Sequence, residues 1–154
     1  MTHQEPTAAE IHEAIACLRR LTEVFSERRR QLALAEGLSE HQWRVLEEIS
    51  TEHFMPSMFA RRRESSPAAV SKTLRQLADK GLIVARVART DGRQRTYEPT
   101  SKGRRTLSHL RARREEAIEH VWQTLDARQL RAFTRFSNQL TERLQEYARR
   151  SHEA

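Results

Sequence analysis

The chain has 154 residues and a net charge of +7, with 28 Lys and Arg against 21 Asp and Glu. This length is enough for one domain with a real hydrophobic core. Apolar runs stay far below the roughly 18 residues of a membrane span, and the polar start MTHQEPTAAE lacks the pattern of a secretion signal. The single cysteine, Cys17, excludes an intramolecular disulfide and a cysteine-rich metal site. These features predict one domain over 1–154, located in the cytoplasm, without a membrane partner.

Two capping boxes mark the first two helices. In a capping box, a Ser or Thr accepts from the amide three residues later, where a Glu or Gln side chain reaches back. Thr7 and Glu10 fit this pattern, and apolar residues then recur at helical spacing to about residue 34. Ser39 and Gln42 fit it again. The pattern therefore predicts a long first helix and a second helix with an apolar face.

Prolines mark the next two helices. Pro56 suits a first helical position, where its missing N–H costs nothing, and predicts a short helix over 56–63. Ser66 as N-cap and Pro67 as first residue predict another start. Gly81 is able to take the left-handed conformation that ends this helix. Its predicted buried stripe consists of Val70, Leu74 and Leu77.

A β-hairpin and two long helices complete the chain. Residues 82–88 and 94–98 have strand composition, and the Asp-Gly pair between them is a hairpin signal. Thr100 is the predicted cap of a long helix with apolar residues as far as Leu125, and Asp126 restarts the chain as a last helix. The fold class is therefore mainly α with a small β-hairpin. The first and last helices carry more apolar surface than this core needs, which favours a two-fold dimer.

The positive charge is concentrated in one region. Residues 55–114 hold 16 Lys and Arg against 4 Asp and Glu, whereas the remainder holds 12 against 17. Such a division is typical of a protein in which one region binds a polyanion. The alternative is a solvated surface in an arginine-rich chain, but this does not explain the acidic remainder.

The helix that starts at Ser66 divides cleanly into two faces. Small and cationic residues lie opposite the apolar stripe, toward the N-terminal half that helix-turn-helix proteins use to touch base edges. Small side chains permit close approach to thymine methyls, and cations reach guanine acceptors or phosphates. The alternative is an ordinary solvated helix face. The predicted DNA contacts on this helix are Ser66, Pro67, Ala68, Ala69, Ser71, Lys72 and Arg75.

Arginines on either side of this helix extend the predicted DNA surface. Arg61 and Arg62 end the preceding helix, where contacts with phosphates position a protein without specifying sequence. In the hairpin, the negative potential of a narrow minor groove favours inserted arginine. Asp91 is expected to hold Arg93 by an ion pair or to cap the turn. The predicted DNA-binding residues of the hairpin are Arg89, Asp91, Arg93 and Arg95.

The whole pattern resembles the MarR family of bacterial transcription regulators. The similarity runs from SEHQWRVLEEI through SPAAVSKTLRQLADKGLI to DGR and TSKGR, and the D-x-R and T-x-K-G pair is its most specific part. The resemblance implies a homodimer, usually an operator-bound repressor that a small ligand, a metal or an oxidant releases. It implies a winged helix-turn-helix over about 39–100, with 66–80 as recognition helix. Residues 7–34 and 101–151 would form the dimer interface.

The first hypothesis for the control of DNA binding is a ligand pocket between the dimer helices and the winged helix-turn-helix. The W-R-V-L stretch resembles regulators of aromatic-compound catabolism, whose effectors are aromatic acids or their CoA thioesters. One of four arginines would then pair with the carboxylate or phosphate: Arg28, Arg29, Arg30 or Arg44. The alternative is that the aromatic residues are plain core. The predicted pocket residues are Arg28, Arg44, Trp43, Phe54, Met58 and Phe59.

Three other forms of control remain open. Cys17 lies in the first helix, as in peroxide-sensing members, although that branch uses tyrosines near the thiol and none occurs before Tyr97. A structural cysteine is the alternative. The histidines are scattered without an i, i+4 pair, so no metal site and no cofactor are predicted. The last possibility is control by abundance alone.

The sequence thus predicts a dimeric repressor that binds a palindromic operator in double-stranded DNA. The rival from another class is a structural protein that binds DNA without sequence preference. An enzyme is not expected, because the chain lacks a nucleophile–base arrangement, a phosphate-binding glycine loop and metal-ligand spacing.

Overall fold

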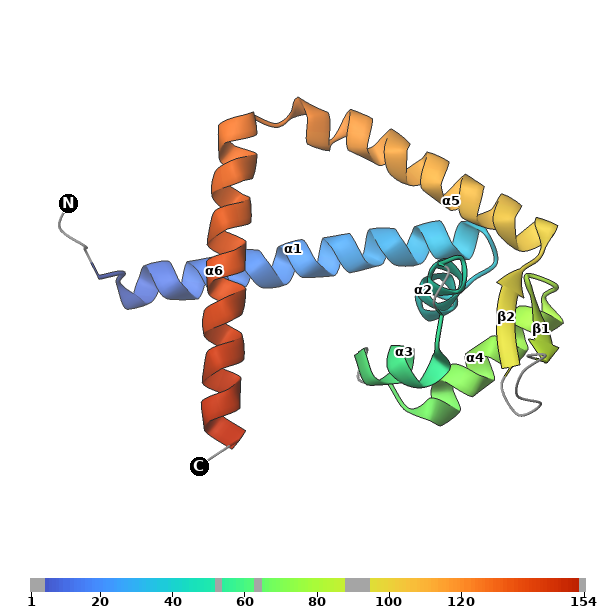
Figure 1. The fold of residues 1–154 in the computed structure, drawn as a ribbon. Coiled ribbons are helices and arrows are strands. Elements are labelled where there is room, and N and C mark those ends of the chain that lie inside the picture. Colours follow the sequence, from blue (N-terminus) through green and yellow to red (C-terminus); the bar gives the residue numbers. More distant parts are fainter. Residues whose placement is uncertain (1–4, 52–53, 63–64, 88–94, 153–154) are drawn as a thin grey trace. The chain divides into compact units, whose positions relative to one another are not determined.

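A computed structural model describes residues 5–51, 54–62, 65–87 and 95–152 (Figure 1). The chain divides after position 111 into two compact units, Met1–Arg111 and Ala112–Ala154. The first unit contains four helices, the hairpin and the first half of α5. The second contains the rest of α5, a 3-10 turn and α6.

Helices α1 (Ala8–Ala35) and α2 (Glu40–Ile49) begin at the predicted capping boxes. The Glu10 amide donates to Thr7 Oγ1 at 3.3 Å, and Glu10 Oε2 accepts from the Thr7 amide at 2.7 Å. The amides of Ser39 and Gln42 make the corresponding pair, both at 3.1 Å. Each box satisfies N–H groups that the first helical turn leaves without an intrahelical partner. Both predicted starts are confirmed.

Helices α3 (Pro56–Arg62) and α4 (Pro67–Asp79) form the helix-turn-helix with α2. The Ser66 hydroxyl accepts from the Ala69 amide at 3.1 Å, so the predicted cap of α4 is confirmed. The predicted stripe of α4 is buried, and α4 packs against both α2 and α3 (Figure 1). Gly81 follows α4 with φ +70°, the left-handed conformation expected at its end.

The strands β1 (Ile83–Val87) and β2 (Arg95–Pro99) form an antiparallel pair. Ile83 lies opposite Pro99, and Val87 lies opposite Arg95. The observed strands start and end within a residue of the predicted bounds. Residues 88–94, which include the predicted turn, lie outside the described residues.

The helix predicted to run to Leu125 is shorter than expected. Helix α5 covers Ser101–His120, a 3-10 turn follows at Trp122–Thr124, and α6 covers Ala127–His152. Asp126 accepts from the amides of Arg128 and Gln129 at 2.8 and 3.1 Å, as its predicted capping role requires. The chain before such a cap is extended, and Leu125 has ψ 148°. The start of α6 thereby rules out a helix that continues through Leu125.

The core of the first unit lies where α2, α4, the hairpin and the end of α1 meet. Its most deeply buried large side chains are Trp43, Phe59, Leu38, Leu46, Leu77 and Leu110. Along most of α1, by contrast, apolar side chains stay about half exposed: Ile11, Ile15, Leu18 and Phe25. Helix α6 shows the same pattern at Phe133, Phe136, Leu144 and Tyr147. None of the described helices is both long and apolar enough to cross a membrane.

Candidate nucleic-acid interface

The outer face of α4 is open at its N-terminal end. Ser66, Pro67 and Ala68 are exposed, and Ala69 is partly exposed. One turn further on, Ser71, Lys72 and Arg75 are exposed on the same side. The apolar stripe on the opposite side of the helix is buried, so this face points to solvent. The structure thus brings together the residues predicted to read bases.

Four exposed cations of α3, α4 and β2 have no partner among the described residues. No hydrogen bond or ion pair within the described ranges involves the exposed side chains of Arg61, Lys72, Arg75 and Arg95. An unengaged guanidinium or ammonium can contact a phosphate or a guanine without first losing a protein partner. Arg62 belongs to α3, although its side chain is not described. Arg89, Asp91 and Arg93 lie outside the described residues, so their contacts remain predictions.

Other cations of the basic region are bonded within the protein. Arg86 pairs with Glu98 across the hairpin at 3.0 Å, and Arg104 donates to the Pro99 carbonyl at 2.8 Å. Lys80 and Lys102 donate to backbone carbonyls at 2.5 and 2.8 Å. A count of charges along the sequence misses this distinction, because these partners lie 5 to 43 residues away.

The T-x-K-G segment, Thr100 to Gly103, forms a joint behind α4. Thr100 Oγ1 donates to the Gly81 carbonyl at 2.7 Å and accepts from the Gly103 amide at 3.1 Å, which caps α5. A Cβ at Gly103 would lie 2.1 Å from the Leu82 carbonyl oxygen, so only glycine fits there without a shift of the backbone. We call the set Lys80, Gly81, Leu82, Thr100, Lys102 and Gly103 the α4–α5 joint.

The residues of the predicted ligand pocket do not line one cavity. Trp43 and Phe59 lie in the core, each 1% exposed. Phe54 packs on the core beside Phe59, at 6.0 Å between ring centroids, whereas Met58 is exposed. Arg28 borders a shallow depression on α1 alone, apart from Arg44.

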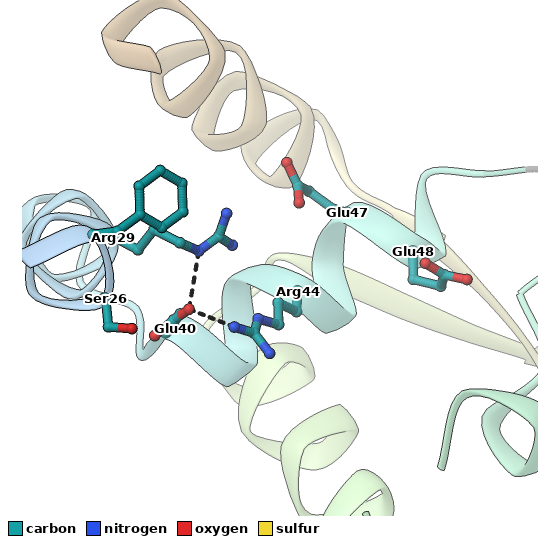
Figure 2. Close-up of a pocket in the computed structure, with 7 residues that line it drawn as sticks. Ser26, Arg29, Glu40, Arg44, Glu47 and Glu48 are labelled. Carbon is teal, nitrogen blue, oxygen red and sulfur yellow. Dashed lines mark hydrogen bonds and ion pairs between the residues drawn. The ribbon is translucent and has the colours of Figure 1, made fainter. Parts of the chain in front are cut away.

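Arg44 instead borders a depression between α1 and α2 of about 310 Å³ (Figure 2). Glu40 accepts from Arg29 at 2.9 Å and from Arg44 at 2.6 Å. Phe25, Ser26, Glu47 and Glu48 complete the lining. The Arg29 guanidinium also lies 4.6 Å from the Trp43 ring centroid, a cation–π contact. Sequence reasoning named Arg29 and Arg44 among the arginines that could pair with an anion. It missed Glu40, although the Glu40–Arg44 spacing of four residues was a usable signal.

Burial of Glu40 is the largest single influence on its pKa and acts to raise it. The hydrogen bonds from Arg29 and Arg44 together outweigh it, so the pKa of the Glu40 carboxyl lies below its ordinary value. Glu40 is therefore a carboxylate at neutral pH. In this structure it occupies both guanidinium groups of the depression.

Cys17 is exposed on α1, with Arg20 Nη2 3.6 Å from its sulfur. Among the described residues, no group of three His, Cys, Asp or Glu side chains is placed to hold a metal ion. Of the scattered histidines, His109 contacts Glu36 at 3.4 Å.

A helix-turn-helix followed by a two-stranded hairpin defines a winged helix-turn-helix, a class of DNA-binding protein. The family model described as MarR family matches residues 36–94, which run from the end of α1 through the hairpin. This segment, 59 of the 154 residues, is therefore similar to the MarR family. A comparison with curated protein sequences gives no match.

Solved structures share this fold over most of the chain. The MarR family transcription regulator SP03579 is 20% identical with a TM-score of 0.82, over 92% of this chain and 94% of that chain. Staphylococcus aureus MarR in complex with salicylate and kanamycin is 18% identical with a TM-score of 0.75, over 90% and 95%. S. aureus MepR in complex with DNA is 15% identical with a TM-score of 0.67, over 90% and 96%. At these identities the likeness establishes the fold.

Proposed function

We propose that this chain is a homodimeric repressor that reads a palindromic operator with α4 and the hairpin. The observation that carries the proposal is the outer face of α4. There, small side chains at its N-terminal end lie next to the unengaged cations Lys72 and Arg75. This composition suits contact with base edges in a major groove. The DNA-bound structure of S. aureus MepR, which has the same fold, supports the assignment.

The exposed apolar stripes on α1 and α6 support dimerisation. On each helix these large apolar side chains recur at helical spacing, and the helix's own unit leaves them about half exposed or more. Surfaces of this kind in soluble proteins mark interfaces. A two-fold dimer covers the same stripe on both copies and presents two α4 helices to successive turns of DNA.

Selection from a random duplex library, followed by titration, tests the proposal. We expect an imperfect palindrome with half-sites about 10 bp apart. The preferred duplex should bind roughly 10³-fold or more tightly than random duplex. A structural protein without sequence preference would instead bind both equally. A footprint over one asymmetric half-site would contradict the dimeric reading.

The proposed effector is an aromatic acid or its CoA thioester, bound in the depression between α1 and α2. Arg29 and Arg44 supply cations for a carboxylate, and Phe25 supplies an apolar contact. The structure of S. aureus MarR with salicylate, an aromatic acid, supports this ligand class. Because Glu40 already occupies both arginines, an anionic ligand would replace it and release the start of α2 from α1.

A thermal-shift titration with salicylate tests this binding mode. Wild-type protein should be stabilised and should release the preferred duplex, while Arg44→Met should lose both responses. If Arg44→Met responds as wild type does, the ligand binds elsewhere.

A thiol switch at Cys17 is the second candidate, favoured by the exposure of the sulfur and its contact with Arg20. Treatment with hydrogen peroxide should then release DNA from wild-type protein but not from Cys17→Ser. Equal release from both would exclude the thiol.

A further inference from the structure

Two lysines of the basic region connect three separate parts of the first unit. Lys80 caps the C-terminus of α4, and its Nζ donates to the carbonyl of Gly37 in the α1–α2 turn at 2.5 Å. Lys102, in the first turn of α5, donates to the carbonyl of Lys80 itself at 2.8 Å. The two bonds form a chain from α5 through the end of α4 to the end of α1.

Neighbouring contacts make this end of α4 the fixed one. In the α4–α5 joint, the Thr100 amide donates to the Leu82 carbonyl at 3.0 Å, and Gly103 lies against the same carbonyl. Gln42, which is buried in α2, donates to Gln76 in the last turns of α4 at 3.0 Å. The polar contacts of α4 with other elements are thus concentrated near its C-terminus, away from the face proposed to read DNA.

The position of this end determines where the reading end lies. Helix α4 has 13 residues, so at a rise of about 1.5 Å per residue it is about 20 Å long. A small tilt at Lys80 therefore displaces Ala68 much more than it displaces residues near the joint. Hydrogen bonds to base edges need donor–acceptor distances near 3 Å and good alignment. Contacts of long cationic side chains with phosphates tolerate such a displacement better.

We propose that Lys80 and Lys102 are positioning residues for DNA recognition and that neither contacts DNA. Lys102 satisfies the Lys80 carbonyl at the C-terminus of α4, and Lys80 satisfies the Gly37 carbonyl just beyond the C-terminus of α1. The helix dipole favours cations at both places. They hold the tilt of the reading helix relative to α1 and α5. The proposal rests on the proposed reading role of α4. It assigns these two exposed cations of the basic region to hydrogen bonds within the protein and not to contacts with DNA.

The experiment compares Lys80→Met and Lys102→Met with Lys72→Met in the full-length chain. All three variants remove one exposed cation and keep an unbranched apolar stem of similar length. The first probe is a random-sequence 30-bp duplex, about three helical turns, titrated over a range of salt concentrations. Each lost phosphate contact lowers the salt dependence, log K against log salt, by about 0.9. We expect that loss for Lys72→Met and an unchanged slope for the other two.

The second probe is the preferred duplex obtained by selection. Lys80→Met and Lys102→Met should each reduce its affinity by about 3- to 10-fold relative to random duplex. Stoichiometric titration counts the active fraction, so partial unfolding alone leaves this ratio unchanged.

Distinct outcomes separate the ways of failing. A fall in slope for Lys80→Met or Lys102→Met equal to that of Lys72→Met would overturn the proposal, because it would make the lysine a phosphate contact. An unchanged ratio of preferred to random affinity in both variants would overturn it as well. If wild-type protein itself shows no preference between the two duplexes, the proposed reading function fails instead.

Discussion

The two ends of α4 differ in what surrounds them. At the N-terminal end, Ser66 caps the helix and the neighbouring small and cationic side chains are open to solvent. At the C-terminal end, Leu77 is buried, and hydrogen bonds of Lys80, Gln76 and Lys102 join the helix to the α1–α2 turn, α2 and α5. The N-terminal end is therefore open to a partner, while hydrogen bonds hold the C-terminal end. The predictions below test this division, starting with the largest effect.

Gly103→Ala should be the most damaging substitution at the held end. Its Cβ would lie 2.1 Å from the Leu82 carbonyl oxygen, which is backbone and cannot rotate away. We expect a loss of about 3 kcal/mol or more in the free energy of unfolding, measured by denaturant titration. Gly37→Ala is the control: its Cβ meets nothing within 4 Å, and only the φ of +71° opposes it, at about 1–2 kcal/mol. Equal stability of Gly103→Ala and wild type would mean that the joint is not closely packed.

Leu18→Glu should dissociate the proposed dimer, so that its two α4 helices no longer bind one duplex together. A carboxylate in the exposed apolar stripe of α1 would be buried in the proposed interface, and its desolvation opposes association. We expect a monomer by light scattering and a loss of about 100-fold or more in affinity for the palindromic duplex. Ala16→Glu adds the same charge to exposed α1 outside the stripe and should stay dimeric. A dimeric Leu18→Glu that retains affinity would place the interface elsewhere.

Lys72→Ala should alter the free end without affecting the fold. The side chain is exposed on α4, so stability should change by no more than about 0.5 kcal/mol. If Lys72 contacts a base, discrimination at one base-pair position of each half-site should fall by about 1–3 kcal/mol. A library binding profile measures this change. Arg19→Ala removes an exposed cation on α1 and should leave the profile unchanged. If it changes the profile as much as Lys72→Ala does, both side chains contribute only non-specific charge and Lys72 does not contact a base.

Ser66→Ala should produce the smallest change, at the cap of the free end. The hydroxyl accepts from the Ala69 amide at 3.1 Å, and loss of an N-cap costs about 1 kcal/mol. Thermal denaturation should detect the loss. Ser71→Ala removes an exposed hydroxyl with no hydrogen bond among the described residues, so its stability should match wild type. Equal melting of the two variants would show that the cap contributes nothing.

Local signals explain how much of this molecule the sequence predicted. Thr7, Ser39, Ser66 and Asp126 act through bonds to residues two or three positions away, so their spacing alone identified the helix starts. Periodicity likewise identified the buried stripe of α4. The end of α5 was misplaced because the extended backbone at Leu125 depends on the cap that follows it.

Long-range contacts explain the rest. Lys80 and Gly37 are 43 residues apart, so nothing in the sequence distinguishes Lys80 from a lysine that is predicted to contact DNA, such as Lys72. The predicted pocket grouped Trp43 with Arg28 because both suited a ligand by type, whereas packing buries the first and directs the second to another surface. Glu40 was missed because its pairing with Arg29 depends on how α1 and α2 pack.

Site-directed DNA cleavage tests the central claim, that the N-terminal end of α4 reads DNA, most directly. An iron chelate coupled to cysteine in Ala69→Cys, with Cys17→Ser to leave one thiol, cuts DNA close to its attachment point. We predict cuts at two sites related by the symmetry of the preferred duplex, at its major-groove half-sites. A chelate placed by Ala16→Cys on α1 should not give these cuts. Absence of cuts from position 69 while the duplex stays bound, or cuts equal to those from position 16, would contradict the account.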